Sequence, residues 1–488
     1  MSAFAAVKVL GALSILDLAV VAIAIALLAL IAWWSGREEK DTQDFFLGGR
    51  RVPAFVACLS FVATEVSAVT ITAVPFTGFS ENWQYLQFFI GAALARIFVA
   101  YLFIPKFFTG NWTSIYEFLR ARFGTQTQYA GSVFFFITRL LGSGVRLFAA
   151  CEAVALILGL SLAQALLLFT IVAIGMIAFG GIKAVVWAGA YEAAVFYLAG
   201  LAVLGYLALN IEGGPTAAWA SAAAAGKLKL FNLQLNLSDP KTLWAAILNA
   251  LFLNLAVFGT DQEFVLRLLT VRTRRASQKA IVGTIAAALP LVCIYLAIGT
   301  LLFVFYQQRP GTAPAGPEAK RVLSYFVVDW LPTGLKGLVL AAVILASIDS
   351  PLASLASSFV SDIYRPVLGR GRSERHYLWV SRLSVVGFGI ILALIAYACQ
   401  PIRNILWFAF EIVSVTGGPM LGIFLFGLLT RQRANLDNVL AMITSAVAMT
   451  TLLILSRIGA VGFGWSWLIV LGTATTFGLS WFLARCHE

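Results

Sequence analysis

Serines recur at helical spacing in the apolar segment from Val339 to Pro366. They follow one another at steps of three or four residues: Ser347, Ser350, Ser354, Ser357 and Ser361. On a helix, their hydroxyls would lie on one face. Sodium is a hard ion that prefers oxygen ligands, and such a face supplies them. The stripe therefore predicts a cation site.

Asp349 places a carboxylate beside that face. An ionised carboxylate near the centre of a bilayer costs at least about 2.5 kcal/mol on insertion scales, so it must meet a cation, a proton or a water-filled cavity. The alternative is that the serines only permit close packing and bond back to the preceding turn. Asp349 and the following Pro351 favour the cation site over this alternative.

Composition places the chain among integral membrane proteins, because 61% of its 488 residues are hydrophobic and only 11% are charged. The five cysteines lack the paired spacing of a disulfide framework or a zinc site. The net charge of +12 lies in short clusters between apolar runs, which is typical of membrane topology and not of a nucleic-acid-binding face. The only two histidines, His376 and His487, fall in a predicted loop and the tail, which disfavours an intramembrane enzyme.

Apolar runs of about 20 residues predict about thirteen membrane-spanning helices in one transmembrane domain, residues 1–488. They are placed near 15–34, 53–78, 83–105, 129–159, 162–181, 184–209, 242–267, 279–306, 334–364, 376–397, 402–429, 436–456 and 464–484. The run 15–34 lacks the features of a cleaved signal peptide, so it is interpreted as a retained helix.

Lysine and arginine are concentrated in alternate loops, such as those around Arg50, Arg274 and Arg372. By the positive-inside rule these loops are cytoplasmic. We therefore expect a multi-pass protein of the plasma (inner) membrane, with its N-terminus outside and its C-terminus in the cytoplasm.

Several charges remain at membrane depth: Glu65, Arg96, Arg139, Arg146, Glu152, Glu192, Asp349, Arg382 and Glu411. Arg139, Gly142, Ser143 and Arg146 are spaced to share one face of the fourth span, where two guanidinium groups would receive an anion. The equally weighted alternative is that both arginines neutralise Glu65 or other acids within the fold, Glu152 or Glu411. Arg96 and Arg382 are interpreted as structural charges.

Two spans carry signals of interruption. The second mixes Thr64, Glu65 and Ser67 with β-branched residues and Pro75, and a break around 66–68 would free backbone carbonyls for a cation. The eleventh contains Gly417-Gly418-Pro419, which predicts a hinge. Two interrupted helices in separate halves of a chain indicate a secondary transporter.

In these segments the chain resembles the sodium/solute symporter family, which includes the sodium/glucose, iodide, monocarboxylate and proline carriers. The similar pieces, in order, are DFFLGGRRVP, ATEVSAVT, GTDQEFVLRLLTVR, the serine stripe ending in SDIYRP, and GGPMLGIFLFGLLTRQRAN. The resemblance implies an all-α inverted-repeat fold of five plus five helices, with repeats at 53–209 and 242–429. It leaves 15–34 as an extra N-terminal helix and 436–484 as two C-terminal helices. It also implies alternating access.

The resemblance further implies a sodium site built from carbonyls of Ala63, Val66 and Val343 and from two adjacent hydroxyls. At the hydroxyl positions this chain has Ala346 and Ser347, so one hydroxyl is missing. Asp349 and Ser350 lie one turn along and could compensate. Members with a second sodium site carry an aspartate where this chain has Ala188-Gly189. We therefore expect one sodium ion per cycle, with proton coupling as the alternative.

For the solute, the resemblance places Glu411 where sugar carriers have a glutamine and Glu65 where they have an asparagine. The expected solute site comprises Glu65, Ser67, Arg139, Ser143, Arg146 and Glu411. Two substrate classes stay open: a small carboxylate or other organic anion held by the arginines, which is slightly favoured, and an amine-bearing or hydroxyl-rich solute held by the acids. A monomeric transport unit in the lipid bilayer is expected, and a transporter-like sensor is a further alternative.

Overall fold

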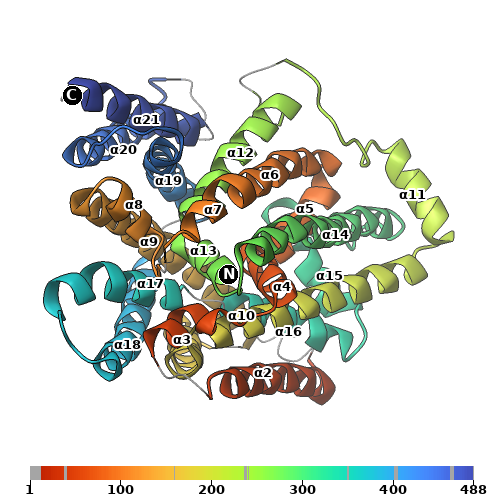
Figure 1. The fold of residues 1–488 in the computed structure, drawn as a ribbon. Helices are drawn as coiled ribbons and strands as arrows, with labels where there is room; N and C mark the ends of the chain where they lie inside the picture. Colours follow the sequence, from red (N-terminus) through yellow and green to blue (C-terminus); the bar gives the residue numbers. More distant parts are fainter. Residues whose placement is uncertain are drawn as a thin grey trace.

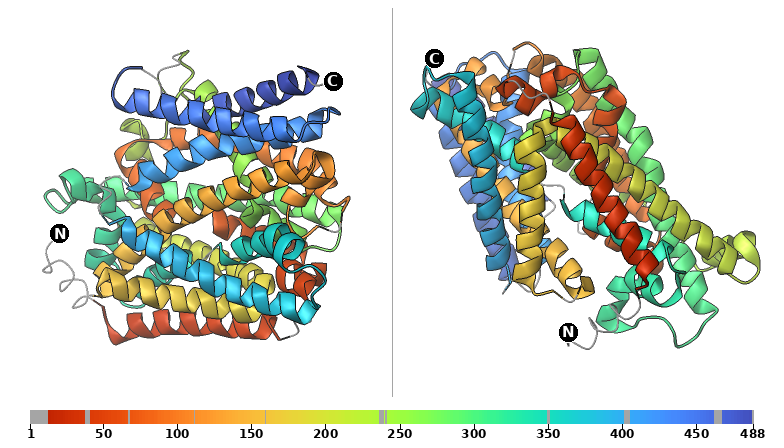
Figure 2. Two further views of the ribbon diagram at one scale, coloured as in Figure 1. Left: turned by 90° about the vertical axis from the view of Figure 1, so that its left-hand side faces the viewer. Right: turned by 90° about the horizontal axis from the view of Figure 1, so that it is seen from below.

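The computed structural model describes residues 13–37, 41–66, 68–110, 112–158, 160–235, 239, 241–348, 351–400, 405–461 and 467–486. These residues form helices joined by turns, with one isolated β-bridge between Val52 and Val271. Most helices run through one bundle, and the last two lie together at its edge (Figure 1). The side views show the long helices running roughly alongside one another (Figure 2).

Within the described residues, ten helices or helical runs are long and apolar enough to cross a membrane. They are α2 (Ile15–Ser35), the run Trp83–Phe107, α9 (Thr125–Leu158), α10 (Leu162–Asn210), α12 (Leu243–Thr260), α14 (Arg274–Gln307), α18 (Glu374–Ala398), α19 (Ile405–Leu429), α20 (Leu436–Arg457) and α21 (Leu468–Cys486). The run Trp83–Phe107 comprises η2 (Trp83–Tyr85), α6 (Leu86–Phe98), η3 (Val99–Phe103) and α7 (Ile104–Phe107). A bent pair, α4 (Ala54–Glu65) and α5 (Ala68–Ser80), makes an eleventh span.

The predicted number of about thirteen spans is reached when α10 is counted as two spans and α16 as one more. Helix α10 has 49 residues, which at 1.5 Å per residue is about 74 Å and more than twice the hydrocarbon core. It divides at Gly181, whose φ of 50° and ψ of −149° are not helical. Helix α16 (Leu335–Ile348) is shorter than a full span and is followed by α17 (Leu352–Ser358).

The remaining helices are short and flank the spans. They are α3 (Thr42–Leu47), η1 (Gly48–Arg50), α8 (Tyr116–Arg122), α13 (Gln262–Leu269), α11 (Gly214–Ala224), η4 (Gly316–Arg321), α15 (Val322–Trp330) and η5 (Phe359–Leu368). Helix α11 lies at the margin of the bundle in Figure 1.

The predicted interruption of the second span is confirmed. Helix α4 ends at Glu65, Val66 takes an extended conformation with φ −90° and ψ 105°, and the chain resumes as α5 after a bend of 65°. The last carbonyls of a helix have no partner within it, so the break exposes the backbone oxygens of this turn.

The second interruption is in the seventh span, and the prediction of a hinge in the eleventh was wrong. Helix α12 ends at Thr260 and α13 begins at Gln262, because Asp261 between them is extended with φ −99° and ψ 122°. Helix α19 runs through Pro419 without a break. Its glycines serve close packing: a Cβ at Gly418 would lie 3.0 Å from the Cα of Gly472 in α21.

The serine stripe does not lie on one α-helix as predicted. Helix α16 ends at Ile348, α17 begins after Pro351, and Phe359–Leu368 is π-helical. Because a π-helix bonds residue i to i+5, it shifts the phase of the face that continues into it. The hydroxyls of Ser354 and Ser357 donate to the carbonyls of Pro351 and Ser354, which is the packing role weighed as the alternative.

Packing brings the two broken spans into the centre of the bundle. Helix α4 packs against α10 and α14, and α12 packs against α6 and α19. Helix α16 packs against α2, α10 and α5. This arrangement places the ends of α4 and α12 around one internal space.

Candidate functional site: a cavity between two broken spans

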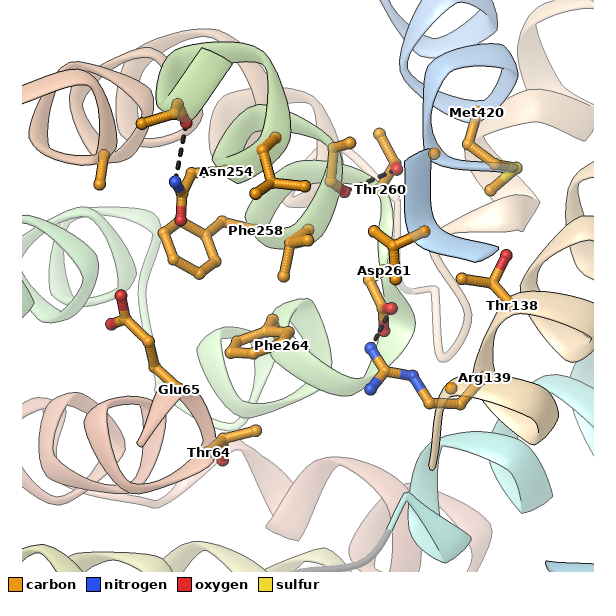
Figure 3. Close-up of a pocket in the computed structure, with 18 of the residues that line it drawn as sticks. Thr64, Glu65, Thr138, Arg139, Asn254, Phe258, Thr260, Asp261, Phe264 and Met420 are labelled. Carbon is orange, nitrogen blue, oxygen red and sulfur yellow. Dashed lines mark hydrogen bonds and ion pairs between the residues drawn. The ribbon is translucent and has the colours of Figure 1, made fainter. Parts of the chain in front are cut away.

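A cavity of about 620 Å³ lies where the two broken spans meet (Figure 3). Both halves of each broken span line it, through Glu65 of α4, Thr70 of α5, Thr260 of α12 and Phe264 of α13. Helices α6, α8, α9, α14 and α19, with η2, complete its wall. Its volume falls within the range of sites for small organic molecules, about 300–1,000 Å³. Both the position and the size suit a transported solute.

Arg139 projects from α9 into this cavity and is neutralised there. Its guanidinium forms ion pairs with Asp261 and Glu263 at the break of the seventh span. Figure 3 shows the contact with Asp261 at one end of the cavity. The prediction that Arg139 faces Glu65, Glu152 or Glu411 was therefore wrong in its partners, because the pairing acids come from α12 and α13.

The sequence reasoning missed Asp261 and Glu263, although both lie in the predicted span 242–267 and in the motif GTDQEFVLRLLTVR. Two acids within an apolar run carried the same signal as the other charges at membrane depth. They were missed because they stand near the predicted end of that run. In the structure, Glu263 is buried and Asp261 lines the cavity.

Glu65 lines the opposite part of the cavity and is held by Arg96 of α6. The guanidinium Nη2 of Arg96 lies 2.5 Å from Oε2 of Glu65, and its Nε donates to Thr284 at 2.9 Å. Arg96 is fully buried and also lies over the ring of Phe258, 4.7 Å from its centroid. The predicted structural role of Arg96 agrees with its bonds to Glu65 and Thr284, which anchor the end of α4 to α6 and α14.

Arg146 is the cavity arginine that forms no ion pair with these acids. Its Nη2 donates to the carbonyl of Thr64 at 3.3 Å, and in the described part of the chain no carboxylate lies within ion-pair distance of it. Glu65 is held by Arg96, and Glu263 is shared by Arg139 and, at 3.9 Å, Arg267. Arg146 therefore keeps donor capacity directed at the cavity.

Two predicted solute-site residues are placed away from this cavity. Glu411 in α19 pairs with Arg457 of α20, with Arg457 Nε donating to Oε1 at 3.1 Å. The charge of Glu411 is thus neutralised by an arginine of a neighbouring helix, and Glu411 does not line the cavity. Ser143 is buried but is not among the lining residues, although Gly142 beside it is. Ser67 lies outside the described residues.

The expected sodium ligands fall on α4 and α16. Ala63 and Val66 are buried at the broken end of α4, where carbonyls lack intrahelical donors. Val343, Ala346 and Ser347 lie in the last turns of α16. Asp349 and Ser350 lie outside the described residues. The break at Val66 lies among the residues whose carbonyls are expected to bind the ion, and the set as a whole stays a prediction.

Gln262, between the two acids that hold Arg139, fastens the break to the neighbouring segments. Its Nε2 donates to the carbonyl of Thr113 at 2.8 Å and to Ser357 at 3.1 Å, and its Oε1 accepts from the backbone N–H of Ile115 at 3.0 Å. Gln262 is fully buried. At this break the carboxylate of Asp261 therefore faces the cavity, and the amide of Gln262 binds the surrounding segments.

Asp362 continues that polar cluster on the side away from the cavity. Its carboxylate accepts from Ser114 at 2.7 Å, from Gln128 at 2.9 Å and from Ser132 at 2.9 Å. These bonds join η5 to α9 and to the turn that also binds Gln262. The sequence signal for this cluster is the acid within SDIYRP, at the end of the serine stripe.

Comparison with known proteins places these features in a family. A model of the sodium:solute symporter family matches residues 45–452. The sodium/sialic acid symporter SiaT of Proteus mirabilis (strain HI4320) is 28% identical over 435 residues, which cover 87% of this chain and 87% of that protein. The sodium-coupled monocarboxylate transporter 1 of Homo sapiens is 27% identical over 406 residues, covering 81% of this chain and 66% of the human protein.

The architecture agrees with this match. A solved, substrate-bound, outward-open structure of a sodium-coupled sialic acid symporter has a TM-score of 0.87 to this chain at 25% identity, and the match covers 97% of this chain and 98% of that one. The predicted all-α membrane fold with an inverted-repeat core is thereby confirmed. From the interrupted helices, the cavity between them and these matches, we conclude that the chain belongs to the sodium:solute symporter family.

Proposed function

We propose that this protein is a symporter that uses a sodium gradient to carry a small organic anion across the plasma membrane by alternating access. The observation that carries the choice of an anion is Arg146, whose guanidinium lines the cavity with no carboxylate at ion-pair distance in the described residues. A charged group in a low-dielectric cavity is costly unless a counter-ion joins it. A carboxylate solute would supply that counter-ion and accept two parallel hydrogen bonds.

The same geometry weakens the competing proposal of an amine-bearing solute. That proposal needed free carboxylates in the cavity, whereas Glu65, Asp261 and Glu263 are each bound to an arginine. Glu411 is bound to Arg457. An amine would have to compete with an existing guanidinium at every one of these acids.

Sodium coupling rests on the relatives and on the end of α4. The relatives named above are sodium-coupled, and α4 ends at Glu65, between the two residues of that segment whose carbonyls are expected to hold the ion, Ala63 and Val66. Ala346 and Ser347 supply one hydroxyl where two were expected, so we infer one weakly held sodium ion per cycle. Proton coupling through Asp349 is the alternative.

We also infer the arrangement of the chain. Helices from Ala54 to Asn210 form the first repeat and those from Leu243 to Leu429 the second, since each begins with a broken span. Helix α2 precedes the repeats, and α20 and α21 follow them. The transport unit is a monomer with its N-terminus outside and its C-terminus in the cytoplasm.

Uptake into proteoliposomes containing the purified protein tests the proposal. A panel of radiolabelled monocarboxylates is offered with an inward sodium gradient, with equal sodium on both sides, and with a proton gradient alone. We expect accumulation only under the sodium gradient. Accumulation that follows the proton gradient would replace sodium as the driver, and accumulation of amines in preference to carboxylates would overturn the anion.

A further inference from the structure

We propose that the transported anion has an apolar body, aromatic or branched alkyl, and is not a polyhydroxylated acid. This inference rests on the proposed function, because it assumes that Arg146 binds the anionic head. It concerns the remainder of the cavity, which must accept the rest of the solute. Two observations carry it: the residues that form the wall, and the state of the polar groups among them.

Most of the wall away from the arginines is apolar. The aromatic and aliphatic lining residues are Phe88, Phe89, Phe135, Leu253, Val257, Phe258, Phe264, Val292, Val413 and Met420. They come from α6, α9, α12, α13, α14 and α19, so the apolar surface surrounds the cavity instead of covering one side. In Figure 3, Phe258 and Phe264 are drawn between Glu65 and the Asp261–Arg139 pair. A solute that spans the cavity must contact them.

Several of the hydroxyls and amides that interrupt this wall already have partners. Thr138 donates to the carbonyl of Phe134, and its oxygen also bonds to the hydroxyl of Thr416, both at 2.7 Å. Three more lining groups donate to backbone carbonyls: the Thr260 hydroxyl to Ala256 at 2.8 Å, the Asn254 amide to Ala250 at 2.7 Å, and the Tyr116 hydroxyl to Thr260 at 3.1 Å. These donors are directed into the helices.

The consequence for selectivity follows from desolvation. A polyhydroxylated acid entering this cavity would give up the hydrogen bonds of each hydroxyl to water, and these four wall donors are engaged elsewhere. An apolar body has no such bonds to lose, and its transfer from water to the apolar wall is favourable. Aromatic side chains around it add edge-to-face contacts. Selectivity between two monoanions of similar size is thus set by their bodies.

The test uses four probes that separate charge from body: phenylacetate, gluconate, phenylacetamide and phenethylamine. Sodium-driven uptake of radiolabelled phenylacetate into proteoliposomes is measured, and the other three compete with it. We expect phenylacetate to be accumulated and gluconate to compete at least about 10-fold more weakly. Phenylacetamide, which has the same body without the charge, should compete weakly as well.

The outcomes distinguish this inference from the proposed function. Direct uptake of radiolabelled gluconate that equals or exceeds that of phenylacetate would overturn the apolar body and leave the anion proposal standing. Sodium-driven uptake of radiolabelled phenethylamine or phenylacetamide, with no uptake of either anion, would overturn the proposed function itself. Uptake of phenylacetate with exclusion of gluconate supports both.

A substitution in the wall gives a second, independent measurement. Phe88→Tyr keeps the aromatic ring in the wall and adds one hydroxyl, which cannot donate to a carbonyl of its own helix as a threonine hydroxyl does. We expect the preference for phenylacetate over gluconate to fall severalfold. The matched control is Phe55→Tyr in α4, an exposed residue that does not line the cavity and should leave that ratio unchanged. An unchanged ratio in Phe88→Tyr, with normal uptake, would count against contact between this wall and the body of the solute.

Discussion

At the scale of single residues, two arginines that are equivalent in the sequence differ in the structure. Arg139 and Arg146 are seven residues apart on α9 and both line the cavity. Arg139 meets two acids at the break of the seventh span, whereas Arg146 meets a backbone carbonyl. We therefore assign to Arg139 a structural role in the site and to Arg146 the binding of the solute. Each can be tested by removing its charge.

Arg146→Gln should abolish most anion uptake while the protein remains folded. Losing hydrogen bonds to a charged group costs about 1.5–3 kcal/mol, or about 10-fold or more in affinity. Initial uptake rates over a range of phenylacetate concentrations, with the melting temperature in detergent, measure both effects. The companion Arg139→Gln should lower the melting temperature instead, because it leaves Asp261 and Glu263 without their shared cation. A folded Arg146→Gln protein with full uptake would remove this residue from the solute site.

Ala346→Ser should restore the hydroxyl that the expected sodium site lacks. Sodium binds oxygen ligands, so one more should lower the sodium concentration for half-maximal uptake severalfold. Ser347→Ala, which removes the remaining hydroxyl, should raise it. The sodium dependence of uptake at a fixed anion concentration checks both. Sodium curves that coincide with that of the unaltered protein in both variants would place the ion elsewhere.

At the scale of elements, the break between α12 and α13 organises the site. Three consecutive residues there make different contacts. Asp261 and Glu263 form ion pairs with Arg139, and Gln262 donates a hydrogen bond to the turn around Thr113. That turn is joined through Ser114 to Asp362 of η5. A short extended link can serve both sides because its neighbouring side chains point in different directions. The cavity and the polar cluster behind it therefore share one piece of backbone.

Gln262→Ala should weaken this link and lower both stability and transport rate. It leaves the backbone N–H of Ile115 and the hydroxyl of Ser357 with one partner fewer in a buried place, at about 1–3 kcal/mol for each unsatisfied group. The melting temperature in detergent and the maximal uptake rate report the two effects. Gln308→Ala is the control, since that side chain bonds to exposed backbone at Glu212. A Gln262→Ala protein as stable and as fast as this control would contradict the role of the link.

At the scale of the whole molecule, the helices build a bundle whose centre holds two interrupted spans. The spans α4–α5 and α12–α13 expose backbone and charge where continuous helices would present only apolar side chains. Such irregular backbone is tolerated in a membrane only inside protein or beside a water-filled cavity. The breaks and the cavity therefore belong together.

The predicted orientation can be tested through Cys486, which is the exposed cysteine at the end of α21. If the C-terminus is cytoplasmic, a membrane-impermeant maleimide should label it only after cells are permeabilised. Cys486→Ser should remove that label, because Cys58, Cys151 and Cys399 are buried and the partly exposed Cys293 lies within the membrane-spanning helix α14. In the Cys486→Ser background, Ser221→Cys in the exposed part of α11 should be labelled in intact cells. The opposite pattern would reverse the topology.

The sequence alone determined the features that depend on local composition. Long apolar runs predicted the spans, because a bilayer requires about 20 apolar residues per helix. The mixture of Glu65, β-branched residues and Pro75 predicted the break in the second span, since these residues disfavour a continuous helix. It also predicted which charges must be sheltered from lipid, and the family resemblance supplied the repeat architecture.

Only the tertiary structure decided which charges meet. Arg139 and Asp261 are 122 residues apart, and Arg96 reaches Glu65 from another helix. No local pattern encodes such pairs, because an arginine buried in a membrane protein accepts any acid that the packing of distant helices brings to it. The structure likewise places the second break at Asp261 and pairs Glu411 with Arg457. Arg146 remains as the cavity arginine with capacity to bind a solute.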